Sequence, residues 1–191
     1  AVELSSGTTV TSTGLNSIGI YLDGDTSTSP ITPFTGTYAL KNSGTITLGD
    51  SSTGIYGKNM NTSIGNAGTI TVGNNSTAAY AEDVNLENIS GGNINIGNNS
   101  TGMYQVTNSA KNTSNSGTIT GLSGSNASTG IVVENTGTAS TPTAKNESTG
   151  IVLINGTNGV GMYSKGSNDS NITNAGTITL ANGISKSNPN V

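Results

Sequence analysis

Short stretches in which apolar and polar residues alternate recur along the chain. In GTITVG, Ile70 and Val72 alternate with threonines, and glycine stands at each end. This period of two, with β-branched residues throughout, predicts a short strand with one buried face. The segments STAAY and STGIY that follow such stretches predict a second short strand. Segments such as NTSIGN, with Ile64, and SNITN, with Ile172, predict a third.

The same phrases return at a fixed spacing. NSGTITLGDSSTGIY begins at Asn42, NAGTITVGNNSTAAY at Asn66 and SGGNINIGNNSTGMY at Ser90, so successive copies lie 24 residues apart. Weaker copies such as NSIGIY, STGIVV, STGIVL, GVGMY and NAGTITLANG extend the pattern over almost the whole chain. A fixed period of this size indicates a solenoid. Leucine-rich repeats have a similar period, but they need a leucine frame and a helical segment that these phrases lack.

The predicted fold is therefore an all-β parallel β-helix with about 24 residues and three short strands per coil. Dividing the 191 residues by this period gives about eight coils. The low hydrophobic content, 30%, would also suit a disordered chain. The periodicity argues against disorder, because a thin coil needs only one or two inward side chains per strand and takes stability from its neighbours.

Glycine and asparagine have recurring places in the repeat. Glycines at strand ends suit corners that need a positive φ, and asparagine tolerates the same backbone. Asparagine also stands two residues before the glycine that opens the GTIT phrase. Stacked in successive coils, these side chains are expected to form a hydrogen-bonded ladder. The residues concerned are Asn42, Asn66, Asn115 and Asn174.

The composition excludes several kinds of chemistry. With no histidine and no cysteine, the sequence predicts no histidine base, no thiol nucleophile, no ordinary zinc site and no disulfide. We expect no cofactor and no bound metal. Six lysines, no arginine and a net charge of −4 argue against binding to nucleic acid.

Carboxylates are the remaining candidates for catalysis, which would make the chain a polysaccharide-cleaving β-helix enzyme. Asp23 and Asp25 flank a glycine, and this pattern fits a calcium site, an acid and base pair, or a solvated turn. Glu82, Asp83 and Glu87 follow Tyr80 as a small acidic cluster or as solvated surface. Enzymes of this shape also usually use arginine or lysine beside the substrate carboxylate, and this chain has no arginine. A non-enzymatic role is therefore the preferred prediction.

Two regions depart from the repeat. From Tyr56 to Asn66 is 10 residues, whereas from Tyr21 to Asn42 is 21. We expect the excess, within residues 23–38, to leave the coil as a loop that binds a ligand or packs on the rod. The second region covers residues 121–158, where widened turns are expected to project from one side. The loop residues considered for ligand binding are Pro30, Pro33, Phe34 and Tyr38.

Tyrosines recur at one position of the repeat. If Ile55, Ala79 and Met103 point inward, the tyrosine that follows each of them points outward. Such a column of phenol rings would suit glycans or the hot spots of protein partners. The opposite facing, with the rings buried, stays open at this point. The column consists of Tyr56, Tyr80 and Tyr104, and Tyr21 and Tyr163 extend it.

The phrases GTITVGNNSTAAY, NSGTITLGDSSTGIYGKN and NAGTITLANG resemble the passenger domains of fusobacterial-type monomeric (type Va) autotransporter adhesins. The resemblance covers roughly residues 14–183. It implies a right-handed β-helix on the bacterial cell surface, exported through a C-terminal outer-membrane β-barrel and monomeric. It also implies that the partner is a host cell-surface protein or glycan, or the surface of another bacterium.

Residues 1–20 lack the features of a signal peptide, and no apolar run is long enough to span a membrane. We therefore expect residues 1–191 to form a single β-helix segment of a larger passenger. Three functions remain open for this segment: an adhesin, a polysaccharide-cleaving lyase or hydrolase, and a passive stalk that holds a binding site away from the cell.

Overall fold

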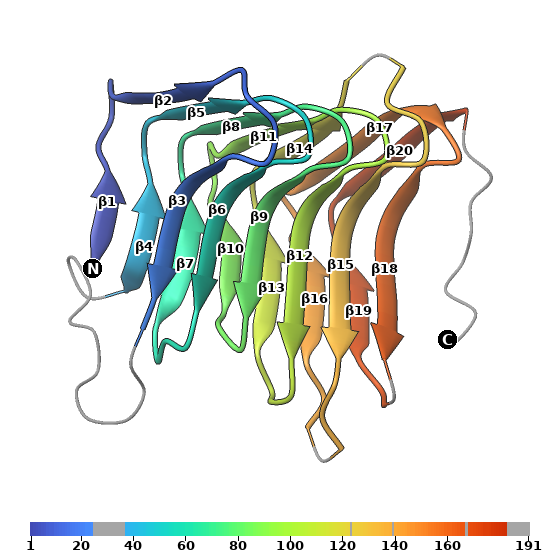
Figure 1. Ribbon diagram of the computed structural model, residues 1–191. Coiled ribbons are helices and arrows are strands. Elements are labelled where there is room, and N and C mark those ends of the chain that lie inside the picture. The colour runs from blue at the N-terminus through green and yellow to red at the C-terminus, as the bar shows by residue number, and fades with distance from the viewer. Residues whose placement is uncertain (25–36, 123, 139, 167, 183–191) are drawn as a thin grey trace.

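The computed structural model describes residues 1–24, 37–122, 124–138, 140–166 and 168–182. These residues form three parallel β-sheets, and no helix occurs among them. In Figure 1 the chain rises along the rear sheet, crosses the top sheet and descends along the front sheet, and it advances from the N-terminal to the C-terminal side with each coil. This is a right-handed parallel β-helix, as predicted.

Each coil contributes one strand to each sheet, so neighbouring strands in a sheet are three apart in the chain. Sheet A consists of β1 (Val2–Leu4), β4 (Tyr38–Asn42), β7 (Ser63–Asn66), β10 (Leu86–Asn88), β13 (Asn112–Asn115), β16 (Thr143–Asn146) and β19 (Asn171–Asn174). Sheet B consists of β2 (Thr9–Ser12), β5 (Thr45–Leu48), β8 (Thr69–Val72), β11 (Asn93–Ile96), β14 (Thr118–Gly121), β17 (Ile151–Thr157) and β20 (Thr177–Asn182). Sheet C consists of β3 (Ile18–Asp23), β6 (Thr53–Lys58), β9 (Thr77–Glu82), β12 (Thr101–Thr107), β15 (Thr129–Asn135) and β18 (Val160–Gly166).

The coils are longer on average than the sequence repeat predicts. Leu4 and the six asparagines that follow it at the equivalent position of sheet A are separated by 38, 24, 22, 27, 31 and 28 residues, so the mean coil holds about 28. The described residues accordingly form sheets of seven, seven and six strands, in place of the eight coils expected. Turns absorb the difference, because a strand needs only its neighbours above and below, whatever the length of the connection.

The core is a narrow column of aliphatic side chains between the three sheets. Each regular strand of sheet B turns two of them inward, as with Ile70 and Val72 in β8, while the threonines between them face out. Sheet A adds one inward side chain per coil, aliphatic in most coils, as with Ile64, and a threonine at Thr113. Sheet C adds residues such as Ile55. The largest fully buried side chains are Leu40, Ile46, Ile55, Ile64, Ile70, Leu86, Ile94, Ile96, Met103, Ile119, Ile131 and Ile154.

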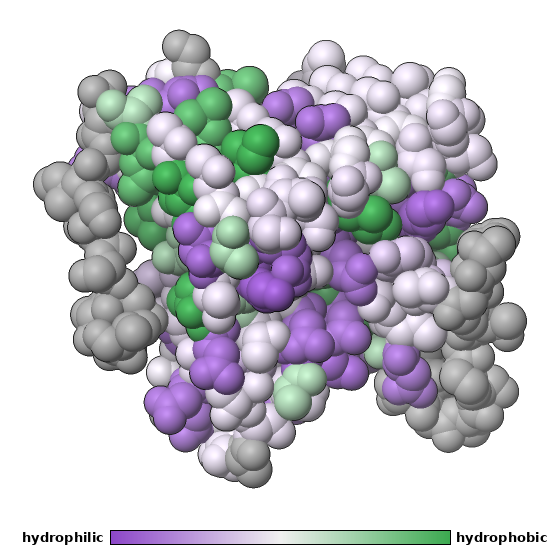
Figure 2. All heavy atoms as spheres, turned by 180° about the vertical axis from the view of Figure 1, so that it is seen from behind, coloured by the Kyte–Doolittle hydropathy of each residue, from purple (hydrophilic) through white to green (hydrophobic). Residues whose placement is uncertain are grey.

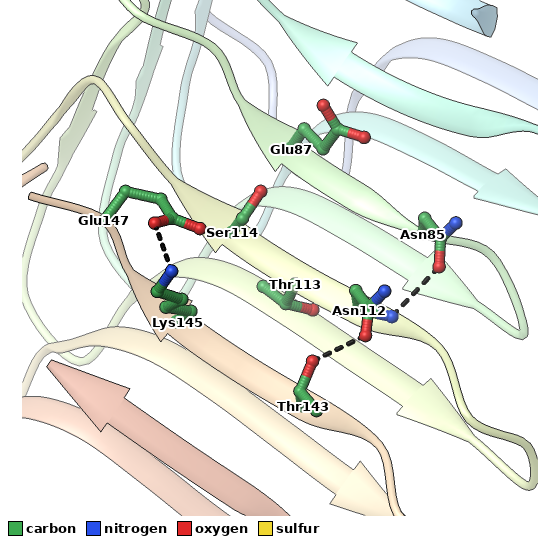
Figure 3. A pocket seen from close by; sticks show the side chains of 8 residues that line it. All are labelled: Asn85, Glu87, Asn112, Thr113, Ser114, Thr143, Lys145 and Glu147. Carbon is green, nitrogen blue, oxygen red and sulfur yellow. Dashed lines mark hydrogen bonds and ion pairs between the residues drawn. The ribbon is translucent and has the colours of Figure 1, made fainter. Parts of the chain in front are cut away.

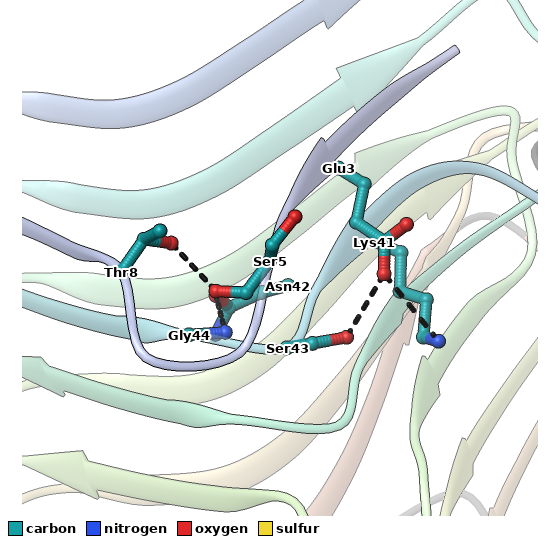
Figure 4. A network of polar contacts seen from close by, with 7 residues as sticks. All are labelled: Glu3, Ser5, Thr8, Lys41, Asn42, Ser43 and Gly44. Atoms are coloured by element: carbon teal, nitrogen blue, oxygen red, sulfur yellow. Dashed lines mark hydrogen bonds and ion pairs between the residues drawn. The ribbon is translucent and has the colours of Figure 1, made fainter.

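A continuous ladder of asparagine side chains runs through the corner between sheets A and B. Each side-chain amide donates from Nδ2 to Oδ1 of the asparagine in the next coil, at 2.7–2.9 Å. The backbone N–H of Gly44 donates to Asn42 Oδ1 at 3.2 Å, within the polar network of Figure 4. The predicted ladder is confirmed and is longer than expected. Its members are Asn42, Asn66, Asn88, Asn115, Asn146 and Asn174.

Asn88 and Asn146 escaped the sequence pattern because they stand four residues before the corner glycine, not two. The two extra residues form a small turn in which the glycine N–H donates to the carbonyl oxygen of the residue after the asparagine. The asparagine still donates to the oxygen of that glycine, at 3.3 Å for Asn88 and 3.2 Å for Asn146. The ladder therefore continues through coils of different lengths.

The glycine that opens each GTIT phrase is required for space, whereas the positive φ expected from the sequence occurs at other glycines of the turns, such as Gly7, Gly91 and Gly124. A Cβ on Gly68 would lie 2.8 Å from the carbonyl carbon of Ser43 and still closer to the oxygen of Gly44. The left-handed positions at the corner between sheets B and C are held by other residues, among them Ser51 and Asn75, with φ of 55° and 53°. In five coils the next corner residue there is serine, and the N–H of each of the first four donates to the serine Oγ of the following coil, as from Ser52 to Ser76 at 3.0 Å.

The irregular region over residues 121–158 differs from its prediction. The widened turn 122–128 joins sheet B to sheet C, whereas the turn 136–142 joins sheet C to sheet A. They leave different corners, so the expectation of a common side was wrong. The repeat aligns the phrase STGIVL with the second strand of the coil, which lies in sheet C. The phrase lies instead in sheet B, because Ile151 pairs with Thr118. Its glycine, Gly150, occupies the crowded corner after the asparagine ladder, and the similar phrase STGIVV remains in sheet C.

Candidate functional site

The outer face of sheet C carries the predicted column of tyrosines. Ile55, Ala79 and Met103 are fully or almost fully buried, so the tyrosine that follows each of them points outward. The strand register places these tyrosines one above another in successive coils. The facing predicted from alternation is thus correct, and the column is Tyr21, Tyr56, Tyr80 and Tyr104.

The rings of this column pack against one another. The centroids of Tyr21 and Tyr56 lie 5.0 Å apart and those of Tyr56 and Tyr80 4.9 Å apart, both edge to face. Tyr80 and Tyr104 stack at 5.5 Å with 21° between their planes. The column is then interrupted by Val132, which is 4% exposed, before Tyr163 resumes it. Aromatic pairs at these distances stabilise the sheet by about 0.5–1.5 kcal/mol each.

Charged side chains, with one valine among them, form a second column two residues further along each strand. In coil order it reads Asp23, Lys58, Glu82, Val106, Glu134 and Lys165. We name the two columns together the tyrosine–carboxylate face. The charged column was missed by sequence reasoning, although the phrases YLD, YGK, YAE, YQV and YSK contain its signal at the second residue after each tyrosine.

Phenol hydroxyls connect the two columns. The hydroxyl of Tyr56 donates to Glu82 at 3.0 Å, and that of Tyr104 donates to Glu134 at 2.5 Å. Lys165 Nζ lies 3.0 Å from the same Glu134 carboxylate and 5.3 Å from the centre of the Tyr104 ring. At the other end of the face, Asp23 accepts from Tyr21 at 3.0 Å and from Asn59 at 2.8 Å, and Lys58 Nζ lies 3.2 Å from it.

These contacts shift the ionisation of the groups involved. Burial would raise the pKa of Glu134, but the hydrogen bond from Tyr104 and the contact with Lys165 outweigh it, so the pKa lies below its ordinary value. The hydrogen bonds to Tyr104 and Glu134 raise the pKa of Lys165. Asn59 is the main cause that lowers the pKa of Asp23. Around neutral pH the face therefore presents fixed carboxylates and ammonium groups beside neutral phenols.

The phenols make stability depend on alkaline pH. Burial, followed by the hydrogen bond to Glu82, raises the pKa of Tyr56 to about 12, and burial also raises the pKa of Tyr80 and Tyr104. A group whose pKa rises on folding contributes its full stabilisation below its unfolded pKa of about 10, and loses it as the pH rises through the folded value. We expect urea denaturation to show constant stability up to about pH 10 and a steady loss towards pH 12.

Tyr56→Phe is the matched control for this titration, because it keeps the ring and removes the ionisable hydroxyl. It should make the alkaline loss of stability less steep. The ultraviolet absorbance of phenolate, followed in the folded protein, measures the ionisation directly. If Tyr56→Phe leaves the phenolate titration of the folded protein unchanged around pH 12, the assignment of the raised pKa is wrong.

Tyr38 lies on a different face from the tyrosine column. It begins strand β4 of sheet A, its ring covers Gly65, and its hydroxyl donates to Glu87 at 2.7 Å. Burial, together with this carboxylate, raises its pKa. Of the other loop residues predicted to bind a ligand, Pro30, Pro33 and Phe34 lie outside the described residues, so their role stays a prediction.

The outer face of sheet A also carries a polar hollow of about 390 Å³ (Figure 3). Seen from behind in Figure 2, hydrophilic residues gather over the middle of the molecule, while hydrophobic residues gather towards the C-terminal end. Thr143 donates from Oγ1 to Asn112 at 2.5 Å, and Lys145 pairs with Glu147 at 2.6 Å. The hollow is lined by Asn85, Glu87, Asn112, Thr113, Ser114, Thr143, Lys145 and Glu147.

The carboxylates considered for catalysis are distributed over the molecule. Glu82 lies on the tyrosine–carboxylate face, whereas Glu87 lies on the outer face of sheet A. Asp83 occupies the corner between them, where its Oδ1 accepts from the Thr107 hydroxyl and the Asn108 N–H, both at 2.8 Å. The three therefore do not form a cluster, since the chain turns a corner at Asp83. Asp25 lies outside the described residues, so its pairing with Asp23 stays a prediction.

Within residues 1–24, 37–122, 124–138, 140–166 and 168–182, no three carboxylates come together as metal ligands. No helix long and apolar enough to span a membrane occurs in those ranges. Comparison of the chain with protein-family models, with curated proteins and with solved structures finds no match, so the site rests on its geometry alone.

Proposed function

We propose that this chain is a segment of a bacterial cell-surface adhesin, and that the tyrosine–carboxylate face is its contact surface. The partner would be a protein or glycan on a host cell, or the surface of another bacterium. Binding would be non-catalytic and monomeric, with the β-helix as a rigid support. The observation that carries this proposal is the run of four packed tyrosine rings on the outer face of one sheet.

Several features of the face support recognition. Its rings are held by their neighbours and by hydrogen bonds to carboxylates, so they lose little conformational entropy when a partner binds. Tyr21 remains 47% exposed and Tyr163 39% exposed, and the rings between them are half-buried. Tyrosine offers an apolar face together with a polar edge, which suits protein hot spots and sugar rings alike.

The two other functions are less well supported by the described geometry. The carboxylates of a polysaccharide-cleaving enzyme would have to flank one substrate bond, whereas Glu82 and Glu87 are on different sheets. Glu134 shares a face with Glu82, but it is already paired with Lys165. The polar hollow of sheet A holds Glu87 and Glu147, and both already have partners, Tyr38 and Lys145. A passive stalk would need no aromatic column on its surface, and the experiment below separates it from an adhesin.

Binding of the purified, labelled protein to epithelial cells and oral bacteria tests the proposal. The double variant Tyr56→Ser and Tyr80→Ser removes the centre of the column. We expect wild type to bind saturably and the variant to bind about tenfold more weakly or worse, as for the loss of an aromatic hot spot. Circular dichroism and thermal unfolding should first establish that both proteins are folded.

Leu153→Ser is the matched control, because it removes an outward apolar side chain of similar depth from sheet B. It should leave binding unchanged. Full binding by the tyrosine variant would contradict the assignment of the contact face. Absence of binding by wild type would indicate a stalk, and turnover of a polysaccharide would indicate the enzyme.

A further inference from the structure

Two carboxylates of the charged column are neutralised by a lysine from the next coil. Asp23 is paired with Lys58 at 3.2 Å, and Glu134 is paired with Lys165 at 3.0 Å. The acid and its lysine occupy the same register position in adjacent strands of sheet C. The chain thus uses one arrangement twice, at the two ends of the face.

The third carboxylate of the column, Glu82, lacks this lysine. The residue that follows it in the register is Val106, which is half-buried and faces outward. In the preceding coil Lys58 occupies the register position next to Glu82, but its ammonium forms an ion pair with Asp23. Within the described residues the Glu82 carboxylate accepts one hydrogen bond, from Tyr56, and takes part in no ion pair.

The surroundings of Glu82 suit a cation. Val106 lies in register between Glu82 and Glu134, and of these two carboxylates Glu134 is already paired with Lys165, whereas Glu82 has no lysine partner among the described residues. The stacked rings of Tyr80 and Tyr104 stand beside it in the neighbouring column. Burial raises the pKa of Tyr80, the charges of Glu82 and Glu134 raise it further, and the charge of Lys165 lowers it.

Lys165 shows how a cation is held on this face. Its ammonium lies against a carboxylate and 5.3 Å from the centre of a tyrosine ring. An ammonium group above an aromatic ring is attracted by the negative face of the ring, and a carboxylate adds a charged hydrogen bond. Glu82 and Tyr80 supply the same two kinds of group, a carboxylate and a tyrosine ring, although the Tyr80 ring stacks on Tyr104 and the carboxylate accepts from Tyr56.

We propose that the space above Val106, between Glu82 and the Tyr80 ring, is a subsite for a lysine ammonium of a partner protein. The partner's lysine takes the place that the chain fills with Lys58 and Lys165 in the two complete units. This proposal deepens the proposed function, because it selects a basic protein surface as the partner of the tyrosine–carboxylate face. The net charge of −4 favours the same class of partner.

The test uses Nα-acetyl-lysine methylamide as the probe and follows the ring signals of Tyr80 and Tyr104 by nuclear magnetic resonance. The probe should shift these signals saturably, and the neutral Nα-acetyl-norleucine methylamide should not. Glu82→Gln should weaken lysine binding by about fivefold or more. Val106→Lys should abolish it, because the chain then supplies its own cation.

Two controls separate the subsite from general effects of charge. Glutamine has a side chain almost as long as that of lysine but no charge, so Val106→Gln should retain binding. Glu87→Gln removes another carboxylate that accepts a tyrosine hydroxyl, on sheet A, and should also retain it. Equal shifts with the norleucine probe, or unchanged lysine binding in Glu82→Gln or Val106→Lys, would overturn the subsite. Lysine binding that persists in a protein unable to bind cells would overturn only the adhesive function.

Discussion

Replacing Asn66 with alanine is expected to lower the free energy of unfolding by about 3–5 kcal/mol. Asn66 is 1% exposed, accepts from Asn42 at 2.7 Å, and donates to Asn88 at 2.9 Å and to the Gly68 oxygen at 3.2 Å. Alanine leaves the Asn42 amide and the Asn88 oxygen buried without these partners, at about 1–3 kcal/mol each, and also leaves a cavity. Urea denaturation followed by circular dichroism measures the loss.

Asn93→Ala is the matched control, since Asn93 is exposed and, among the described residues, its side chain donates only to the Gly91 oxygen, at 3.1 Å. It should change the free energy of unfolding by less than about 0.5 kcal/mol. Hydrogen exchange adds a local measurement: in Asn66→Ala, strands β7 and β10 should lose the most protection, because each coil is stabilised by its direct neighbours. A loss in Asn66→Ala no larger than that of the control would contradict a structural role for the ladder.

The second large effect is expected at Gly68, where alanine should destabilise the protein by more than about 3 kcal/mol. The added Cβ would lie 2.8 Å from the Ser43 carbonyl carbon and 2.9 Å from the Gly44 nitrogen. Both are backbone atoms of the preceding coil and cannot rotate away. The coils would have to separate, which weakens the hydrogen bond from the Thr69 N–H to the Gly44 oxygen, 2.9 Å in the native protein.

Gly91→Ala distinguishes crowding from backbone strain. Gly91 has a φ of 88°, and no atom lies within 4 Å of the position that an alanine Cβ would take. Alanine there should therefore cost only about 1–2 kcal/mol of left-handed strain. Thermal and urea denaturation of the two variants give the comparison. Equal losses at the two positions would show that conformation, and not the approach of neighbouring coils, explains the corner glycines.

Much of the fold follows from short-range patterns. Alternation in GTITVG identifies the strands of sheet B and the side chains they bury, as with Ile70 and Val72. The same alternation gives the outward facing of Tyr56 and its equivalents, because successive side chains of a strand point to opposite faces. These predictions succeed because each depends only on residues within one strand and on the repetition of that strand.

The candidate site was only partly accessible in this way. The outward tyrosines could be predicted, but their partners depend on which residues share a register position in neighbouring coils. Glu134 follows a valine in its strand, so no local phrase connects it with Tyr104, 30 residues earlier. The incomplete unit at Glu82 and Val106 likewise becomes visible only after the strands have been aligned.

By itself the sequence determined the three-strand coil, the inward and outward sides of the strands and most of the asparagine ladder, because these follow from periods of two and of about 24 residues. The tertiary structure alone decided the coil lengths, the corner from which each widened turn leaves, and the sheet that receives each phrase, as STGIVL and STGIVV show. The physical reason is that strand register depends on pairing, packing and hydrogen bonding with the neighbouring coil. Gly150 in its crowded corner and the buried Asn146 before it place STGIVL in sheet B, in spite of its similarity to STGIVV.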